Sequence, residues 1–352
     1  MEINSIIKHK VIKTKNRQNT KNTQNTKNTH KTKKQKNNNS ITITKTKNVK
    51  IKNYKSKKKS LIKEIKKNNK IYKNKVKTYK NKIITINKRI YTEYTDYINN
   101  IVSLDHKLWN FKRESVYTDI LEHILPYHGQ SYFIEIKKHF FNFYKKYNKL
   151  LIKLCTANDL YGNPRKIKFK NFMKCSSTNL RYILHSLLIL TFMQKHKLKS
   201  IDIIEIGGGY GGLSFFLQNI SKIFNINIIS YTIFDLPNIS KLQSIYLKTL
   251  NSDKNMNFYQ IDNYKNLKKN SFLIANYSYS EISLDLQKEY TDKILNPYVS
   301  HGFLVWNFIP LYNFIDNKHI VSEIEYPDTS KRYPDSISIN PNNYVTFEPI
   351  TV

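Results

Sequence analysis

The chain has 352 residues and a formal net charge of +35 at pH 7, and only two of its residues are cysteines. Cys155 and Cys175 exclude a disulfide framework and fit a reducing compartment, although they allow one disulfide. No apolar run approaches the roughly 18 residues that span a bilayer, and the N-terminus lacks the apolar core of a secretory signal. We therefore expect an intracellular, cytoplasmic protein without membrane insertion.

The positive charge is concentrated at the N-terminus. Residues 1–90 hold 30 Lys and Arg against 2 acids, whereas residues 91–352 hold 30 against 23. Residues 1–60 consist mostly of Lys, Asn and Thr, and they cannot bury enough apolar area to offset their ordering entropy. We predict that residues 1–90 form a largely disordered basic tail, which either binds polyanions weakly or is merely solvated.

Residues 91–200 have the periodicity of helices. Apolar side chains recur every three or four residues from Thr92 to Leu154, including Ile124 and Leu125. Residues 158–171 contain Gly162 and Pro164 and are predicted to form a loop. Ser176 or Ser177 is expected to cap a further helix over residues 179–195. We predict a helical cap domain on the acceptor side of whatever site follows.

After residue 200 the period changes to alternating strands and helices. Strands are predicted at 201–206, 226–234, 257–261, 272–277, 303–308, 319–326 and 344–350, and helices at 213–224, 239–250 and 285–295. Strands separated by helices form parallel sheets, and the last two strands resemble a hairpin. Residues 201–352 are therefore predicted to form a doubly wound α/β sheet, mostly parallel, with seven strands.

A cluster of glycines marks the candidate cofactor site. Five of the 8 glycines of the chain lie in the loop between the first strand and its helix, at Gly207, Gly208, Gly209, Gly211 and Gly212. Glycine permits positive φ and close backbone approach, and a helix N-terminus favours an anionic group. The spacing Gly207-x-Gly209-x-x-Gly212 also satisfies the dinucleotide fingerprint, so an NAD-binding oxidoreductase is an alternative.

Two acids beside this loop favour S-adenosylmethionine. Glu205 gives the pattern E-x-G-x-G-x-G up to Gly211, which resembles the first motif of Rossmann-like methyltransferases, where the acid helps to position the methionine end. Asp235 closes the second strand, where a carboxylate can accept hydrogen bonds from both ribose hydroxyls. It is followed by Leu236-Pro237, as in small-molecule O-methyltransferases. Alternatively, Asp235 only caps the next helix.

A narrower resemblance, to a family of sugar O-methyltransferases within the S-adenosylmethionine-dependent class, extends from about Trp109 to Pro310. It rests on Trp109-Asn110-Phe111-Lys112, residues 120–124 with Gly129-Gln130, Asn158-Asp159-x-x-Gly162-Asn163-Pro164, residues 177–182, the glycine loop with Tyr210, residues 277–281, and Trp306-Asn307. The chain departs from the family at Cys175-Ser176, where Ser-Pro is expected. The resemblance implies methyl transfer from S-adenosylmethionine to a hydroxyl of a sugar or glycan.

The acceptor side requires a group that removes the hydroxyl proton. Residues 276–281, from Asn276 to Glu281, follow the fourth strand and should face the reaction centre. We predict Glu281 as general base and His123 as the second candidate. The alternative for Glu281 is that it is an N-cap or first-turn acid of the helix that follows, over residues 285–295. Arg181 is expected to contact the cofactor carboxylate, as an alternative to an exposed ion pair.

Asp262 follows the third strand and is expected near the adenine. No spaced set of His, Asp and Glu indicates a metal ion. A methyltransferase acting on RNA or another polyanion, captured by residues 1–90, is the main alternative. The near-balanced charge of residues 91–352 argues against it, because nucleic-acid enzymes usually carry basic charge around the active cleft.

Overall fold

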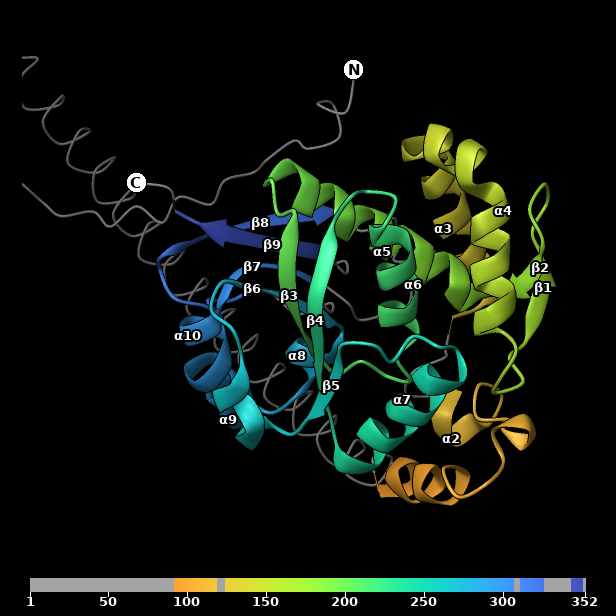
Figure 1. Ribbon diagram of the computed structural model, residues 1–352, viewed down its shortest axis with the longest axis horizontal. Helices are drawn as coiled ribbons and strands as arrows, with labels where there is room; N and C mark the ends of the chain where they lie inside the picture. Colours follow the sequence, from red (N-terminus) through yellow and green to blue (C-terminus); the bar gives the residue numbers. More distant parts are fainter. Residues whose placement is uncertain (1–91, 119–123, 307–310, 326–342, 351–352) are drawn as a thin grey trace, which may run out of the picture. The chain divides into compact units, whose positions relative to one another are not determined.

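The computed structural model of the chain describes residues 92–118, 124–306, 311–325 and 343–350 (Figure 1). The predicted basic tail, His123 and the end of the family resemblance at residues 307–310 lie outside these described residues.

A seven-stranded sheet forms the centre of the described structure, in the order β5-β4-β3-β6-β7-β9-β8 (Figure 1). Neighbouring strands are parallel except β9, which runs antiparallel to both β7 and β8. The strands are β3 (Ser200–Ile206), β4 (Asn227–Phe234), β5 (Met256–Tyr259), β6 (Ser271–Asn276), β7 (Val299–Trp306), β8 (His319–Glu325) and β9 (Asn343–Pro349). The predicted doubly wound, mostly parallel sheet is confirmed, and its strand bounds agree closely with those expected.

Helices cover both faces of this sheet. Residues 92–101 are helical, and the other helices are α2 (Ser115–Thr118), α3 (Pro126–His139), α4 (Phe141–Asn158), α5 (Ser177–Lys195), α6 (Gly212–Ser221), α7 (Pro237–Thr249), α8 (Ser278–Glu281), α9 (Leu284–Tyr290) and α10 (Asn296–Tyr298). Short 3-10 turns lie at His106–Leu108 and Ile261–Asn266, and a π-helical turn at Thr291–Leu295.

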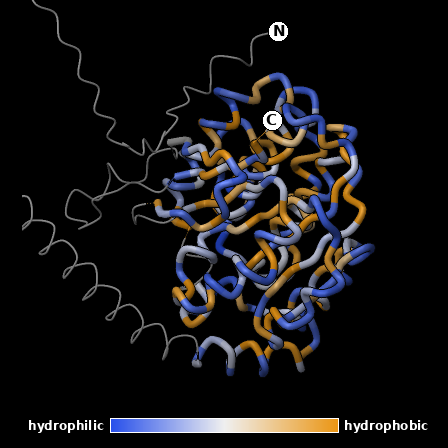
Figure 2. The backbone as a smooth tube through the Cα atoms, turned by 90° about the vertical axis from the view of Figure 1, so that its left-hand side faces the viewer, coloured by the Kyte–Doolittle hydropathy of each residue, from blue (hydrophilic) through white to orange (hydrophobic). Residues whose placement is uncertain are grey.

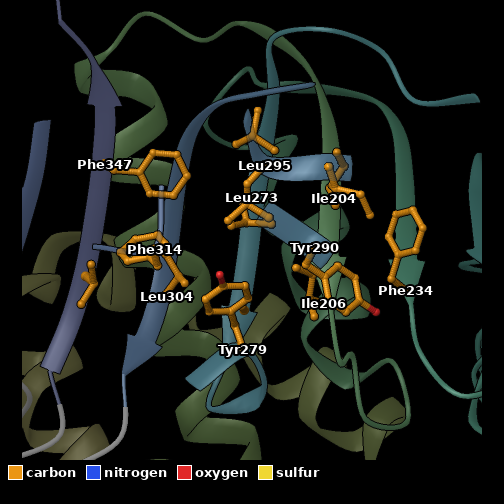
Figure 3. Close-up of a cluster of buried hydrophobic side chains, with 14 of the residues drawn as sticks. Ile204, Ile206, Phe234, Leu273, Tyr279, Tyr290, Leu295, Leu304, Phe314 and Phe347 are labelled. Carbon is orange, nitrogen blue, oxygen red and sulfur yellow. The ribbon is translucent and has the colours of Figure 1, made fainter. Parts of the chain in front are cut away.

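The alternation of side chains along β3 divides the core into two layers. Ile204 and Ile206 point into a cluster that α8, α9 and the π-helical turn cover, together with Phe347 of β9 (Figure 3). Glu205 has the opposite orientation, because successive residues of a strand face opposite sides of the sheet. The central strands are buried on both faces, which explains their nearly continuous apolar sequence.

The structure corrects several local expectations in the helical region. Ile124 and Leu125 are not helical, because Pro126 begins α3 and disfavours helical geometry in the residue before it. The segment predicted as a loop, residues 158–171, contains β1 (Lys166–Lys168), which forms a hairpin with β2 (Lys174–Ser176) beyond the end of that segment. Its three-residue strands are too short to produce a readable alternation.

The start of α5 also differs in detail from the expectation. Ser176 is the N-cap residue, but its side chain does not cap the helix. Its hydroxyl donates to Asp159 Oδ1 at 2.8 Å, and its backbone N–H donates to Oδ2 at 2.7 Å. Asp159 therefore holds the turn at the position where the sequence departs from the family pattern.

Cys155 on α4 and Cys175 on β2 are both free and buried. Along the described chain, hydrophobic stretches are interrupted by hydrophilic ones (Figure 2). None of the described helices combines the length and the apolar character that crossing a bilayer requires.

Candidate functional site

Three neighbouring strands end at the same edge of the sheet. β3 ends at Ile206, β4 at Phe234 and β6 at Asn276. The chain passes from β3 to β4 on one side and later returns to β6 on the other, so the strand order reverses next to β3. Ligands of open α/β sheets bind beyond the carboxyl ends of the strands at such a reversal.

The glycine loop follows β3 at this edge. Gly207 and Gly211 have φ values of +70° and +90°, which side-chain-bearing residues rarely adopt, and a Cβ at Gly207 would overlap the side chain of Ser278. Gly211 is the N-cap of α6, and no side chain caps that helix. The loop therefore brings an uncapped helix N-terminus to the edge, a geometry that favours an anionic group.

Glu205 lies beneath the loop and is 2% exposed. Tyr231 Oη donates to its Oε2 at 2.9 Å from the neighbouring strand β4. Burial raises the pKa of Glu205 to about 7, the hydrogen bond from Tyr231 opposes this, and the charge of Asp235 adds to it. A cationic neighbour would favour the charged form of this carboxyl group.

Asp235 follows β4 and is held by the residue after it and by α7. Its Oδ1 accepts from the Leu236 N–H, and its Oδ2 accepts from Gln243 Nε2, both at 2.9 Å. Burial raises the pKa of Asp235 to about 6, against the lowering effect of these hydrogen bonds. Gln243 Nε2 also donates to the Gly209 carbonyl at 2.8 Å, so one amide ties the acid to the glycine loop.

Two buried acceptor atoms at the site have no hydrogen-bond partner among the described residues. They are Gln243 Oε1 and Asn276 Oδ1. An unsatisfied buried acceptor costs about 1–3 kcal/mol, so such atoms commonly meet a ligand or ordered water. Asn276 ends β6, and Gln243 reaches the same edge from α7 through Asp235 and Gly209, which fits a ligand that carries hydroxyl or amino donors there.

Asn276 connects the site to the helical region. Its Nδ2 lies 3.2 Å from His185 Nδ1 on α5. Burial and then the charge of Arg181 lower the pKa of His185, so the imidazole stays neutral. Arg181 lies one turn earlier on α5, is 8% exposed, and has its guanidinium 5.4 Å from the Tyr182 ring centre. Its predicted contact with the cofactor carboxylate stays a prediction.

Tyr210 of the glycine loop is anchored in the helical region. Its hydroxyl accepts from Asn158 Nδ2 at 3.0 Å, and the Lys112 ammonium lies 4.1 Å from its ring centre. Lys112 Nζ also donates to Tyr246 Oη at 3.0 Å. The buried contacts of Lys112, Asn158 and Tyr246 therefore fix the loop from the side of α4 and α7.

Glu281 is exposed and ends the four-residue helix α8, which begins at Ser278 beside Gly207. It lies in α8, which was not predicted, and not in the first turn of α9, the following helix to which the alternative role refers. It does not cap the next helix, because the hydroxyl of Ser283 caps α9 by accepting from the Leu286 N–H at 3.3 Å. Its role as general base stays a prediction.

Asp262 and Leu236 lie on the surface beside the site. Asp262 is exposed and pairs with Lys293 at 3.3 Å, so its expected role at the adenine stays a prediction. Leu236 is 45% exposed. It lines an open pocket of about 520 Å³, together with Thr95, Asn99, Pro237, Asn238 and Lys241. Within the part of the chain that the structure describes, no group of three His, Cys, Asp or Glu residues is arranged to hold a metal ion.

Sequence reasoning missed Gln243 and Tyr246, and it noted Lys112 and Asn158 only as parts of the family resemblance. Gln243 is fully buried on the inner face of α7, between Ile239 and Tyr246 in the helical repeat. The sequence did offer one signal for a buried polar role of Gln243, because this glutamine lies within the apolar stripe of a predicted helix. Asn158 was noticed only as part of a sequence resemblance, and nothing in the spacing indicates that it meets Tyr210 across 52 positions.

Comparison with known proteins finds only distant similarity to solved structures. No family model and no curated protein matches the chain. Among solved structures, TrmK of M. capricolum bound to S-adenosyl-homocysteine is 11% identical over 46% of this chain and 68% of its own, with a TM-score of 0.33. The mitomycin 7-O-methyltransferase MmcR is 10% identical over 49% and 57%, with a TM-score of 0.29.

The 23S rRNA methyltransferase ErmE is 12% identical, and the match covers 47% of this chain and 70% of the ErmE chain, with a TM-score of 0.30. A fourth similar structure, from Galdieria sulphuraria, is matched over only 47% of its own length. The sheet of the present chain has the strand arrangement of a Rossmann-like methyltransferase fold. Its antiparallel β9 between β7 and β8 distinguishes it from the classic dinucleotide-binding strand order.

Proposed function

We propose that this chain is an S-adenosylmethionine-dependent methyltransferase. The observation that carries the proposal is the set of groups at the glycine loop. Two acids with burial-raised pKa values, Glu205 and Asp235, flank an uncapped helix N-terminus, and the buried acceptor Gln243 Oε1 lies at the same place. This donor and acceptor set fits a ligand with a carboxylate, a cationic amino group and ribose hydroxyls.

Each part of the site has a distinct task in holding the cofactor. The N–H groups at the start of α6 suit its carboxylate, and Glu205 offers negative charge near its amino group. Asp235, with Gln243 behind it, suits the ribose hydroxyls. The bound cofactor supplies an electrophilic methyl group on a sulfonium. The residues of the chain orient the two reactants and accept the proton.

The acceptor is proposed to be a hydroxyl of a sugar or glycan. This rests on the sequence resemblance, which covers the helical region as well as the glycine loop. Glu281 is the proposed base, because α8 begins beside Gly207 and follows β6, whose end faces the proposed methyl group. The Glu281 carboxylate would accept the hydroxyl proton as the acceptor oxygen takes the methyl group and the sulfonium leaves as a neutral thioether.

A screen of acceptors tests this function. Purified full-length protein is incubated with methyl-labelled S-adenosylmethionine and panels of monosaccharides, glycans and RNA, and products are identified by mass spectrometry. We expect one methyl group on a carbohydrate oxygen. Label on a nucleobase would contradict the proposed acceptor, whereas label in no product together with nicotinamide-dependent oxidation of a substrate would contradict methyl transfer itself.

A further inference from the structure

His185 is a fully buried histidine on α5, directly behind the candidate cofactor site. Three aromatic rings pack around its imidazole, those of Tyr132 on α3 at 6.3 Å, Phe303 on β7 at 6.1 Å and Tyr344 on β9 at 5.5 Å. A polar ring in such surroundings costs free energy unless its nitrogen atoms form hydrogen bonds. Its contacts therefore indicate what the ring is for.

The imidazole of His185 meets the side chain of Asn276 at the end of β6. Its Nδ1 lies 3.2 Å from Asn276 Nδ2. Burial, followed by the charge of Arg181, lowers the pKa of His185, so the ring is neutral and keeps one nitrogen as an acceptor. In the observed orientation of the amide, its N–H donates to Nδ1, and its oxygen lies on the other side of the amide.

The amide oxygen of Asn276 is buried and has no hydrogen-bond partner among the described residues. Gln243 shows the same arrangement, since its nitrogen donates to Asp235 and to the Gly209 carbonyl while its own oxygen is buried without such a partner. In both residues the protein holds the nitrogen and leaves the oxygen for a further donor. Buried acceptors of this kind commonly meet a ligand or ordered water.

The two amides lie on opposite sides of β3. Gln243 is tied to Asp235, which follows β4, whereas Asn276 ends β6, the neighbour of β3 on the other side. A ligand that crosses the end of β3 therefore meets both oxygens. Because Asp235 and Gln243 suit the ribose hydroxyls of the proposed cofactor, the methionine end of that cofactor reaches the side of β6.

Glu205 and Asn276 leave the sheet on the same face. Glu205 pairs with Ile274 in the parallel register of β3 and β6, and Asn276 is two positions further along β6. Ile204 and Leu273, which also pair, point into the cluster on the opposite face (Figure 3). A carboxylate and an amide oxygen on one face suit an ammonium group, which has three N–H donors and a positive charge, better than a hydroxyl, which has one donor.

We infer that His185 is a positioning residue, which holds the Asn276 amide so that its oxygen accepts from the cofactor's ammonium group beside Glu205. The inference rests on the proposed function, because it concerns a group of S-adenosylmethionine. His185 acts through Asn276 and touches no reacting atom. Without the ring the amide rotates, and the lost preorganisation weakens binding.

Two ligands and two His185 variants of the full-length protein test this inference by isothermal titration. S-adenosyl-homocysteine carries the ammonium group, and methylthioadenosine has the same nucleoside without the amino-acid end. His185→Phe keeps a flat aromatic ring and removes the acceptor, whereas His185→Asn places an amide oxygen where Nδ1 lies. Affinity for the first ligand relative to the second isolates the contact with the ammonium group.

His185→Phe should weaken S-adenosyl-homocysteine about tenfold, the scale of one lost hydrogen bond, and change methylthioadenosine by less than about twofold. His185→Asn should recover S-adenosyl-homocysteine to within about threefold of the wild type, because the acceptor is restored. The control is Ser186→Ala, which alters the next buried residue of α5 and should leave both affinities unchanged.

A double-mutant cycle shows whether the ring acts through the amide. Asn276→Ala should weaken S-adenosyl-homocysteine by about tenfold to a hundredfold, the range for a hydrogen bond to a charged group. Adding His185→Phe to Asn276→Ala should cause no further loss, because the amide that the ring positions is gone.

Three results would overturn the inference: wild-type affinity for S-adenosyl-homocysteine in His185→Phe, equal losses for both ligands in that variant, or additive losses in the double variant. If the wild type bound neither ligand, the proposed function itself would be contradicted, and the inference with it. If His185→Phe fails to fold, His185→Leu, which also lacks an acceptor, takes its place in the same titrations.

Discussion

Gln243 links the two parts of the candidate cofactor site through a single side chain. Its amide nitrogen donates to Asp235 and to the Gly209 carbonyl, and its oxygen is buried without a partner among the described residues. The acid and the loop are therefore positioned before any ligand arrives. Preorganisation of this kind lowers the entropy cost of binding.

Replacing Glu281 with Gln tests the proposed base. The substitution keeps the shape of the side chain and removes its basicity, so kcat should fall by about 100-fold or more, the usual scale for losing a general base. Cofactor affinity, measured by calorimetry, should not change. The control is Asp285→Asn, an exposed acid in the first turn of α9. Unchanged turnover in Glu281→Gln would make His123 the next candidate and leave Glu281 with a structural role.

The residues next to the glycines could be predicted from the sequence, and those that act across the fold could not. Glu205 and Asp235 have fixed positions relative to a strand end, so the sequence places them beside the loop, whereas the role of Glu205 there is what the family resemblance implies. Gln243 reaches the site only because α7 turns its buried face toward the loop. The partners of Tyr210 come from α4, α7 and the segment before α2, and no local pattern connects them.

At the scale of elements, the end of α5 and strands β7, β8 and β9 bring three histidines together. The ring of His301 on β7 lies 5.4 Å from that of His196 after α5, and His196 pairs with Glu348 on β9 at 2.8 Å. His319 on β8 pairs with Asp316 at 2.8 Å. Burial, followed by the charges of His196 and His319, lowers the pKa of His301 to about 4.

This lowered pKa predicts a loss of stability in acid. Above pH 6.5, His301 is neutral in both the folded and the unfolded chain. Between pH 6.5 and about 4 only the unfolded chain takes up the proton, so the folded state loses stability as the pH falls through that window. His301→Asn should therefore lose less thermal stability than the wild type between pH 7 and 4.5. His106→Gln serves as the control and should lose as much thermal stability as the wild type. If the wild type and His301→Asn lost the same thermal stability over this pH range, the assignment to His301 would be contradicted.

Long periodic elements were predictable and short ones were not. All seven strands of the main sheet were expected within a few residues of their observed bounds, because each has a run of branched and aromatic residues next to a turn. The β1–β2 hairpin escaped prediction because each strand has three residues. The predicted helix over 285–295 begins as α9 but continues as a π-helical turn, a change that periodicity does not reveal.

At the scale of the whole molecule, the distribution of charge separates the N-terminal residues from the rest. Residues 1–90 have almost no core-forming residues in their first two thirds, so deleting them should leave the thermal midpoint and cofactor affinity nearly unchanged. Differential scanning calorimetry of a protein that begins at Tyr91 measures this. Insoluble protein, or soluble protein that no longer binds the cofactor, would contradict the predicted independence of the folded part.

The central claim concerns the identity of the ligand at the glycine loop, and isothermal titration of the full-length protein with S-adenosyl-homocysteine and with NAD measures it most directly. We expect S-adenosyl-homocysteine to bind and NAD to give no heat of binding. Asp235→Ala should weaken the binding by about 1–3 kcal/mol, the scale of a lost hydrogen bond to a charged group, while the exposed Asp253→Ala should not. Binding of NAD without binding of S-adenosyl-homocysteine would contradict the account.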